Sequence, residues 1–109
     1  MNTLDYHVLL ALAAGPRYGY AIKDAVLAES NGALQPRAGT LYRVIARLIT
    51  GGLVTEAEPP ATDPPHPGLA RKYYALTPSG RAALAAEARR LRLAAAMAED
   101  RLGSAGGSL

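Results

Sequence analysis

Residues 37–53, RAGTLYRVIARLITGGL, decide the fold of this chain. The hydrophobic residues of this segment follow the spacing i, i+3, i+4, i+7 and i+8, which places them on one side of an α-helix. They are Leu41, Val44, Ile45, Leu48 and Ile49. Arg43 and Arg47 lie four residues apart and are predicted to share the opposite side. The segment therefore predicts a helix that buries one face and presents arginine on the other. Gly51 and Gly52 supply the helix stop, because glycine enters the left-handed conformation at little cost.

Two further helices are predicted before this segment. Thr3 can cap a first helix that runs to about Ala14, where Gly15-Pro16 ends it. Tyr18 opens a second helix that runs to about Ser30, and the turn signal Asn31-Gly32 follows it.

A β-hairpin and a long helix are predicted after the segment. Residues 53–58 and 70–76 alternate as strands do, and residues 59–68 between them hold five prolines and one glycine, which indicates a loop. Thr77-Pro78 is a typical helix start, and the chain from there to about Leu102 is rich in strong helix formers. Residues 103–109 are expected to form a flexible tail.

Composition and charge exclude several classes of protein. The chain has 109 residues, the size of one domain, and contains no cysteine, so disulfides and thiolate metal sites are ruled out. No apolar run approaches the roughly 20 residues of a membrane span, and the first residues lack a signal-peptide pattern, so a cytoplasmic location is expected. The net charge is +3, and no acidic residue occurs from Ser30 to Thr55. Such concentrated positive charge is typical of a phosphate-binding surface.

The order of these elements predicts a mainly α fold with a small β-hairpin, the winged helix-turn-helix. Residues 1–76 would form the DNA-binding domain, and residues 77–102 a C-terminal dimerisation helix. In this architecture the third helix docks in the major groove of double-stranded DNA, and the hairpin is the wing.

The chain resembles PadR-type transcriptional regulators, and more closely their short subfamily with a single C-terminal helix. The resemblance is carried by four motifs in order: Tyr18–Ile22, Gly39–Leu48, Gly51–Val54 and Arg71–Arg81. It implies a homodimeric repressor whose two recognition helices bind a roughly palindromic operator. It also implies that the C-terminal helix dimerises, and that any small-molecule effector binds between protomers and changes the spacing of the recognition helices.

Seven residues are candidates for DNA contacts. They are Arg37, Thr40, Tyr42, Arg43, Arg47, Arg71 and Lys72. Arg43 and Arg47 could contact phosphates or pair with guanine, and Thr40 could cap its helix or contact a phosphate. Tyr42 could be a core tyrosine with a surface hydroxyl, whereas the family resemblance suggests a phosphate contact by that hydroxyl. Arg71 and Lys72 alternate along a strand, so only one of the two is expected to point at DNA.

The last helix carries apolar residues on two sides, one for its own domain and one for a partner chain. The candidate dimerisation residues are Leu84, Ala88, Leu91, Leu93, Ala95, Met97 and Leu102. A monomeric, partly frayed alanine-rich helix is the alternative.

The chain offers no catalytic constellation and no expected cofactor. His7 and His66 are the only histidines, and neither has a partner for metal binding or acid–base catalysis at suitable spacing. An enzyme is therefore not expected. The alternative to a DNA-binding regulator is a winged-helix module that binds another protein.

Overall fold

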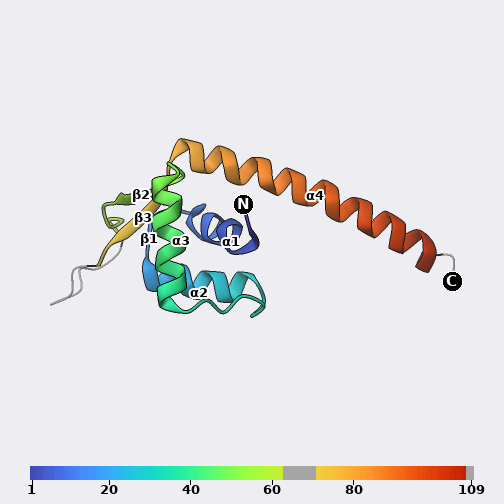
Figure 1. Cartoon of the computed structure of the whole chain (residues 1–109), viewed down its shortest axis with the longest axis horizontal. Helices are drawn as coiled ribbons and strands as arrows, with labels where there is room; N and C mark the ends of the chain where they lie inside the picture. Colours follow the sequence, from blue (N-terminus) through green and yellow to red (C-terminus); the bar gives the residue numbers. More distant parts are fainter. Residues whose placement is uncertain (63–70, 108–109) are drawn as a thin grey trace.

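The computed structural model describes residues 1–62 and 71–107. Three helices pack around one core, namely α1 (Thr3–Leu12), α2 (Gly19–Glu29) and α3 (Ala38–Thr50). A small sheet lies on one side of α3, and α1 lies on the other (Figure 1). The final helix, α4 (Pro78–Gly107), runs along α1 and then projects away from the domain. The molecule is therefore elongated, with extents of 61 × 26 × 26 Å.

The sheet has three strands, which corrects the expectation of a two-stranded hairpin. The predicted hairpin is present as β2 (Val54–Ala57) and β3 (Tyr73–Leu76), which pair antiparallel with Glu56 opposite Tyr74. A third strand, β1 (Arg17–Tyr18), pairs with the other edge of β3. It was missed because two residues are too few to show an alternating pattern, and Tyr18 was assigned to the following helix instead.

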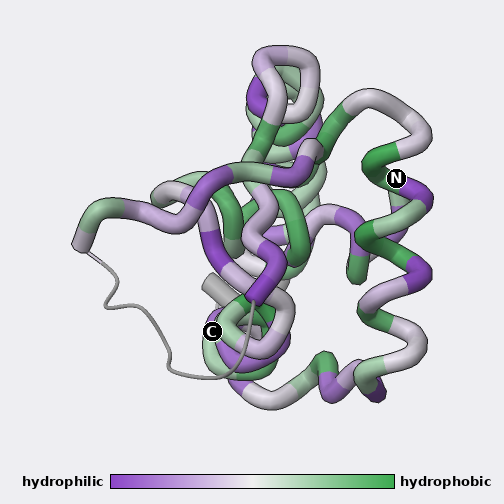
Figure 2. Tube along the Cα trace, turned by 90° about the vertical axis from the view of Figure 1, so that its left-hand side faces the viewer, coloured by the Kyte–Doolittle hydropathy of each residue, from purple (hydrophilic) through white to green (hydrophobic). Residues whose placement is uncertain are grey.

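The core confirms the predicted face of α3 with one exception. Leu41, Val44, Ile45 and Leu48 are buried, but Ile49 is 37% exposed. The side of each helix that faces the core is hydrophobic, and Figure 2 shows hydrophobic and hydrophilic residues alternating along the helical turns. Each large side chain buried in this way contributes about 1.5–3 kcal/mol, so α3 is held by packing on its neighbours.

The start of α1 differs from the prediction. The cap is Asn2 and not Thr3: the Asn2 side chain accepts a hydrogen bond from the Asp5 amide at 2.8 Å. The Asp5 carboxylate in turn accepts one from the Asn2 amide at 3.1 Å. This reciprocal capping box satisfies two amide groups that the helix itself leaves unpaired, which a threonine one residue later cannot do here.

The junction between α3 and α4 is fixed by Thr77, which caps α4 as predicted. Its hydroxyl accepts a hydrogen bond from the Gly80 amide at 2.9 Å and donates one to the Gly52 carbonyl at 2.6 Å. Gly52 has a φ of +78°, so glycine is favoured at this turn.

The last helix continues to Gly107, so residues 103–107 are helical rather than part of the predicted tail. Residues 108–109 and the predicted strand residue 70 lie outside the described residues, as does most of the predicted wing-tip loop.

Gly80 is required by the packing of α4 on the turn after α3. A Cβ atom added at Gly80 would lie 1.9 Å from the Leu53 carbonyl oxygen, which is a backbone atom and cannot rotate away. We expect Gly80→Ala to lower the free energy of unfolding by about 1–3 kcal/mol, as overpacking does. Thermal unfolding followed by circular dichroism measures this.

Gly103→Ala is the matched control in the same helix. No atom lies within 4 Å of a Cβ added there, and alanine is a better helix former than glycine. Equal melting temperatures for the two variants would contradict the proposed contact between Gly80 and Leu53.

Candidate nucleic-acid interface

The outer face of α3 is exposed and bears small residues around one long cation. At 100° per residue, the residues opposite the buried stripe are Gly39, Arg43, Ala46 and Thr50, and all four are exposed. No atom lies within 4 Å of a Cβ added at Gly39. The Thr50 hydroxyl donates a hydrogen bond to the Ala46 carbonyl of its own helix at 3.1 Å. Arg43 is therefore the side chain on this face with the reach and the free donors to bind a ligand.

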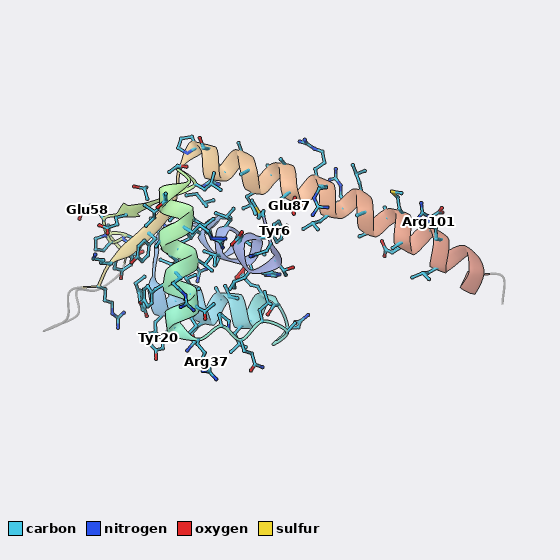
Figure 3. The ribbon with its side chains drawn as sticks, viewed as in Figure 1. Tyr6, Tyr20, Arg37, Glu58, Glu87 and Arg101 are labelled. Atoms are coloured by element: carbon cyan, nitrogen blue, oxygen red, sulfur yellow. The ribbon has the colours of Figure 1, made fainter. Side chains whose placement is uncertain are left out.

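The first turn of α3 adds a second cation and open backbone amides. The N-cap position is Arg37, whose side chain makes no capping hydrogen bond. Thr40 lies three residues later and accepts a hydrogen bond from the Arg43 guanidinium at 3.4 Å, so the capping role considered for Thr40 is wrong. Arg37 lies at the end of α3 farthest from α4, near Tyr20 (Figure 3). Within the part of the chain that the structure describes, neither Arg37 nor Arg43 forms an ion pair.

Arg47 does not share the free outer face with Arg43, which corrects the predicted position of this side chain, whereas its contact with DNA stays a prediction. Its guanidinium forms an ion pair with the carboxylate of Asp5 on α1. The Arg47 side chain is 55% exposed and that of Asp5 only 9%. A step of four residues turns the helix by about 40° beyond a full turn, which moves Arg47 from the centre of the outer face to the flank beside α1.

A hollow lined with tyrosines lies between α2, α3 and the base of the wing. Its volume is about 520 Å³, and it is lined by Tyr18, Gly19, Tyr20, Asp24, Tyr42, Arg71, Lys72 and Tyr74. The Tyr42 ring packs directly on Gly19, where an added Cβ would lie 2.2 Å from the Tyr42 hydroxyl. Of the predicted contact residues, Tyr42 of α3 thus meets Arg71 and Lys72 of the wing here. The sequence pattern did not reveal the hollow, because its lining comes from three separate stretches of the chain.

Arg71 and Lys72 precede strand β3 and have different partners. The Arg71 guanidinium lies 4.0 Å from the centre of the Tyr18 ring, a cation–π contact. Lys72 is exposed, and its Nζ lies 3.4 Å from a carboxylate oxygen of Glu56 on β2. Because an exposed ion pair is weak, the Lys72 ammonium can leave Glu56 for another anion at little cost.

The predicted dimerisation residues divide into two groups. Leu84 is only 9% exposed and belongs to the core of its own domain, so its predicted contact with a partner is corrected. Ala88 is half-buried, whereas every residue from Arg89 to Gly103 is exposed. The exposed group includes Leu91, Leu93, Ala95, Met97 and Leu102. Figure 3 shows Arg101 on this projecting part of α4.

No group of three or more metal-ligating side chains gathers among residues 1–62 and 71–107. None of the helices in these ranges is long and apolar enough to cross a bilayer. His66, for which the sequence suggested no partner, lies outside the described residues.

Comparison with known proteins places this geometry in a family. The model of the transcriptional regulator PadR-like family matches residues 8–86. A PadR family transcription regulator from Clostridium difficile R20291 superposes with a TM-score of 0.73 at 24% identity, covering 94% of this chain and 100% of that chain. Bacillus subtilis PadR in complex with operator DNA superposes with a TM-score of 0.61 at 26% identity, covering 76% of this chain and 45% of that chain.

A curated relative is an uncharacterised 37.1 kDa protein in transposon TN4556 of Streptomyces fradiae. It is 39% identical over 87 residues, which is 80% of this chain but 22% of that protein. The chain therefore spans about a fifth of the length of the curated relative it matches.

The three-helix core, the small antiparallel sheet and the long last helix define a winged helix-turn-helix protein. The chain belongs to the PadR-like family of transcriptional regulators. Members of this family are regulators of transcription and not enzymes.

Tyr74 gives the hollow a testable dependence on pH. Burial raises the pKa of the Tyr74 phenol above its usual value of 10.0, and the neighbouring Tyr42 adds to the rise. A phenol with a raised pKa in the folded state contributes stability that is fully present below pH 10 and is lost as pH rises through the folded pKa. We expect Tyr74→Phe to flatten the fall of the unfolding free energy above pH 10, measured by urea unfolding.

The control for this measurement is Tyr20→Phe, which removes an exposed phenol from the same hollow. If Tyr74→Phe and Tyr20→Phe gave the same slope of stability against pH as the unchanged protein, the effect attributed to burial of Tyr74 would be wrong.

Proposed function

We propose that this protein is a cytoplasmic, sequence-specific DNA-binding repressor that acts as a homodimer on a roughly palindromic operator. The observation that carries this proposal is the outer face of α3. That face is exposed, free of acidic residues and backed by a rigid core, and it presents Arg43 beside small neighbours.

The shape of α3 suits the major groove of DNA. Gly39 and Ala46 place no bulk between the helix backbone and the base edges, so the helix can lie deep in the groove. Arg43 then reaches either a phosphate or the N7 and O6 acceptors of guanine. Arg37 and the uncapped amides of the first turn favour an adjacent phosphate, because a helix N-terminus attracts anions.

The hollow between α3 and the wing supplies further backbone contacts. Tyr42, Arg71 and Lys72 all line it, and tyrosine hydroxyls and cationic side chains are typical donors to DNA phosphates. Thr40, which holds the Arg43 guanidinium, acts in this proposal by orienting Arg43.

DNA binding by this surface is tested with Arg43→Ala. The operator is first selected from a random pool, and affinity is then measured by fluorescence anisotropy. We expect Arg43→Ala to weaken binding by about 10-fold or more, since a bidentate contact with a base contributes roughly 1–3 kcal/mol. Arg89→Ala is the matched control, because Arg89 is an exposed arginine on α4, and its affinity should not change.

The salt dependence of binding tests whether the protein contacts DNA phosphates at all. A dimer that neutralises about 8 phosphates gives a slope of log K against log salt near −7. A slope near zero for the unchanged protein would overturn DNA binding and leave the protein-interaction module as the function.

The distal part of α4 supports the proposed homodimer. Its apolar residues follow a repeat of four and three residues, which is the spacing of a helix–helix seam. The stripe runs through Leu84, Ala88, Leu91, Ala95, Ala98 and Leu102, and its members beyond Ala88 are exposed. The alanines would allow close approach of a second copy, and the proximal end of the stripe is already covered by α1.

Charge on the flank of this stripe favours antiparallel pairing. Arg92 and Glu99 are separated by seven residues, so they lie along one flank of the seam. In an antiparallel pair, Arg92 of one copy faces Glu99 of the other, whereas the apolar side with Leu93 and Met97 points away. The structure offers two apolar sides, and this proposal commits to the side of Leu91, Ala95 and Leu102.

Two glutamate substitutions distinguish the sides. Leu102 is 73% exposed and Met97 is 53% exposed in the single chain, so neither change should unfold the domain. We expect Leu102→Glu to raise the dimer dissociation constant by about 10-fold or more, because it buries two charges in the seam, while Met97→Glu leaves it nearly unchanged. Light scattering after size-exclusion chromatography measures the mass. The opposite result would place the partner on the side of Leu93 and Met97.

A small-molecule effector would act, in this proposal, by changing how the two α4 helices meet. Thr77 and Gly80 tie the start of α4 to the end of α3. A shift of α4 would therefore change the distance between the two recognition helices of a dimer. A cavity of about 300 Å³ lies between the start of α1 and α4, where Tyr6 and Glu87 are neighbours (Figure 3).

A further inference from the structure

Asp5 of α1 forms an ion pair with Arg47 of α3, and neither the fold nor the outer face of α3 explains this pair. Asp5 is the one charged residue that is buried among the described residues, with 6% of the whole residue exposed. Both of its carboxylate oxygens are used. One accepts the Asn2 amide at the start of α1, and the other is paired with the Arg47 guanidinium of α3.

The capping bond anchors the carboxylate in a fixed place. Asp5 also donates its own amide to the Asn2 side chain, so it is held at both its backbone and its side chain. A buried charge is costly unless it is paired. The pair with Arg47 therefore persists in the free protein and holds the guanidinium in one orientation.

Most of the Arg47 guanidinium stays available. Only one of its nitrogens, Nη2, is bonded to Asp5, and the side chain is 55% exposed. An arginine has five N–H donors in a rigid planar fork. The remaining donors lie on the flank of α3, about 40° around the helix from Arg43, where the sugar–phosphate backbone would pass if α3 lay in the major groove.

We infer that Asp5 is a positioning residue for DNA binding, which orients Arg47 for a backbone phosphate while never touching DNA itself. This inference rests on the proposed function. Ordering a long side chain on binding costs about a 2- to 13-fold loss of affinity. Because Asp5 orders Arg47 in advance, that cost is already met in the free protein.

The sign of the effect makes the inference testable. Asp5→Asn removes a negative charge, so electrostatics alone would tighten the binding of DNA. The inference expects the opposite, a weakening of about 5- to 160-fold per dimer, because two arginines must now be ordered. Glu29→Gln is the control, since it removes one exposed negative charge at the end of α2 without touching the pair.

A double-mutant cycle isolates the pair. Asp5→Asn is measured alone and in the background of Arg47→Ala, by anisotropy against the selected operator at several salt concentrations. We expect the weakening to vanish when Arg47 is absent. Arg47→Ala should also reduce the magnitude of the salt slope by about 2 for a dimer, one lost phosphate per protomer.

Several results would overturn the inference. Tighter binding by Asp5→Asn, as for Glu29→Gln, would show that Asp5 only repels DNA. An equal weakening in the Arg47→Ala background would show that Asp5 acts through the fold.

If Asp5→Asn proved too unstable to measure, Arg47→Lys is the second variant, because it keeps the positive charge but loses the planar fork of N–H donors. It should weaken binding several-fold with the salt slope unchanged, and unchanged affinity would refute the role.

Failure of the proposed function gives a different result. In that case the unchanged protein would bind no DNA in a salt-dependent way, and none of these comparisons could show an effect of Asp5. A normal salt slope with no effect of Asp5→Asn would contradict the positioning role alone.

Discussion

The structure depends on the packing of one face of α3 against α1 and α2. Leu41, Ile45 and Leu48 are almost completely buried there, and water is excluded from that side of the helix. Thirteen residues cannot form a stable helix by themselves in water, so this contact makes α3 exist at all. The same contact leaves the opposite face free, and it holds Arg43 on a rigid support rather than on a loop.

The connection from α3 to α4 transmits the orientation of one helix to the other. The turn after α3 passes through Gly52, and Thr77 bonds back to that turn while it caps α4. Gly80 then packs against the Leu53 backbone. This 30-residue helix is fixed at its start, and its residues from Arg89 to Gly103 are exposed. In the proposed dimer, a partner bound along this exposed part of α4 would therefore influence the position of α3.

Three arginines that were predicted from the sequence to contact DNA have different surroundings in this fold. Arg43 is free apart from Thr40, Arg47 is paired with a buried carboxylate, and Arg71 lies on a tyrosine ring. In the proposed function, these three arginines would therefore contribute differently to DNA binding. The Arg43 guanidinium is free to bind different groups, whereas the ion pair with Asp5 already sets the orientation of Arg47.

Local patterns in the sequence were sufficient for much of the architecture. The periodicity of α3, the cap at Thr77 and the glycine stop at Gly51-Gly52 act within a few residues, so they can be read from the chain directly. The order of the helices and the hairpin then indicated the winged helix-turn-helix, and the motifs of the family agreed with it. The exact ends of the helices and strands were harder to predict. The short strand β1 was also harder to predict, because a two-residue strand exists only through its pairing with β3.

The sequence by itself determined which helix has an apolar face and a cationic face, because that pattern repeats every three or four residues. Only the tertiary structure decided that Asp5 and Arg47, 42 positions apart, are paired. It also decided that tyrosines from three separate stretches of the chain share one hollow. Contacts of this kind depend on how helices are placed relative to one another. That placement follows from the packing of the whole core and leaves no local signal in the chain.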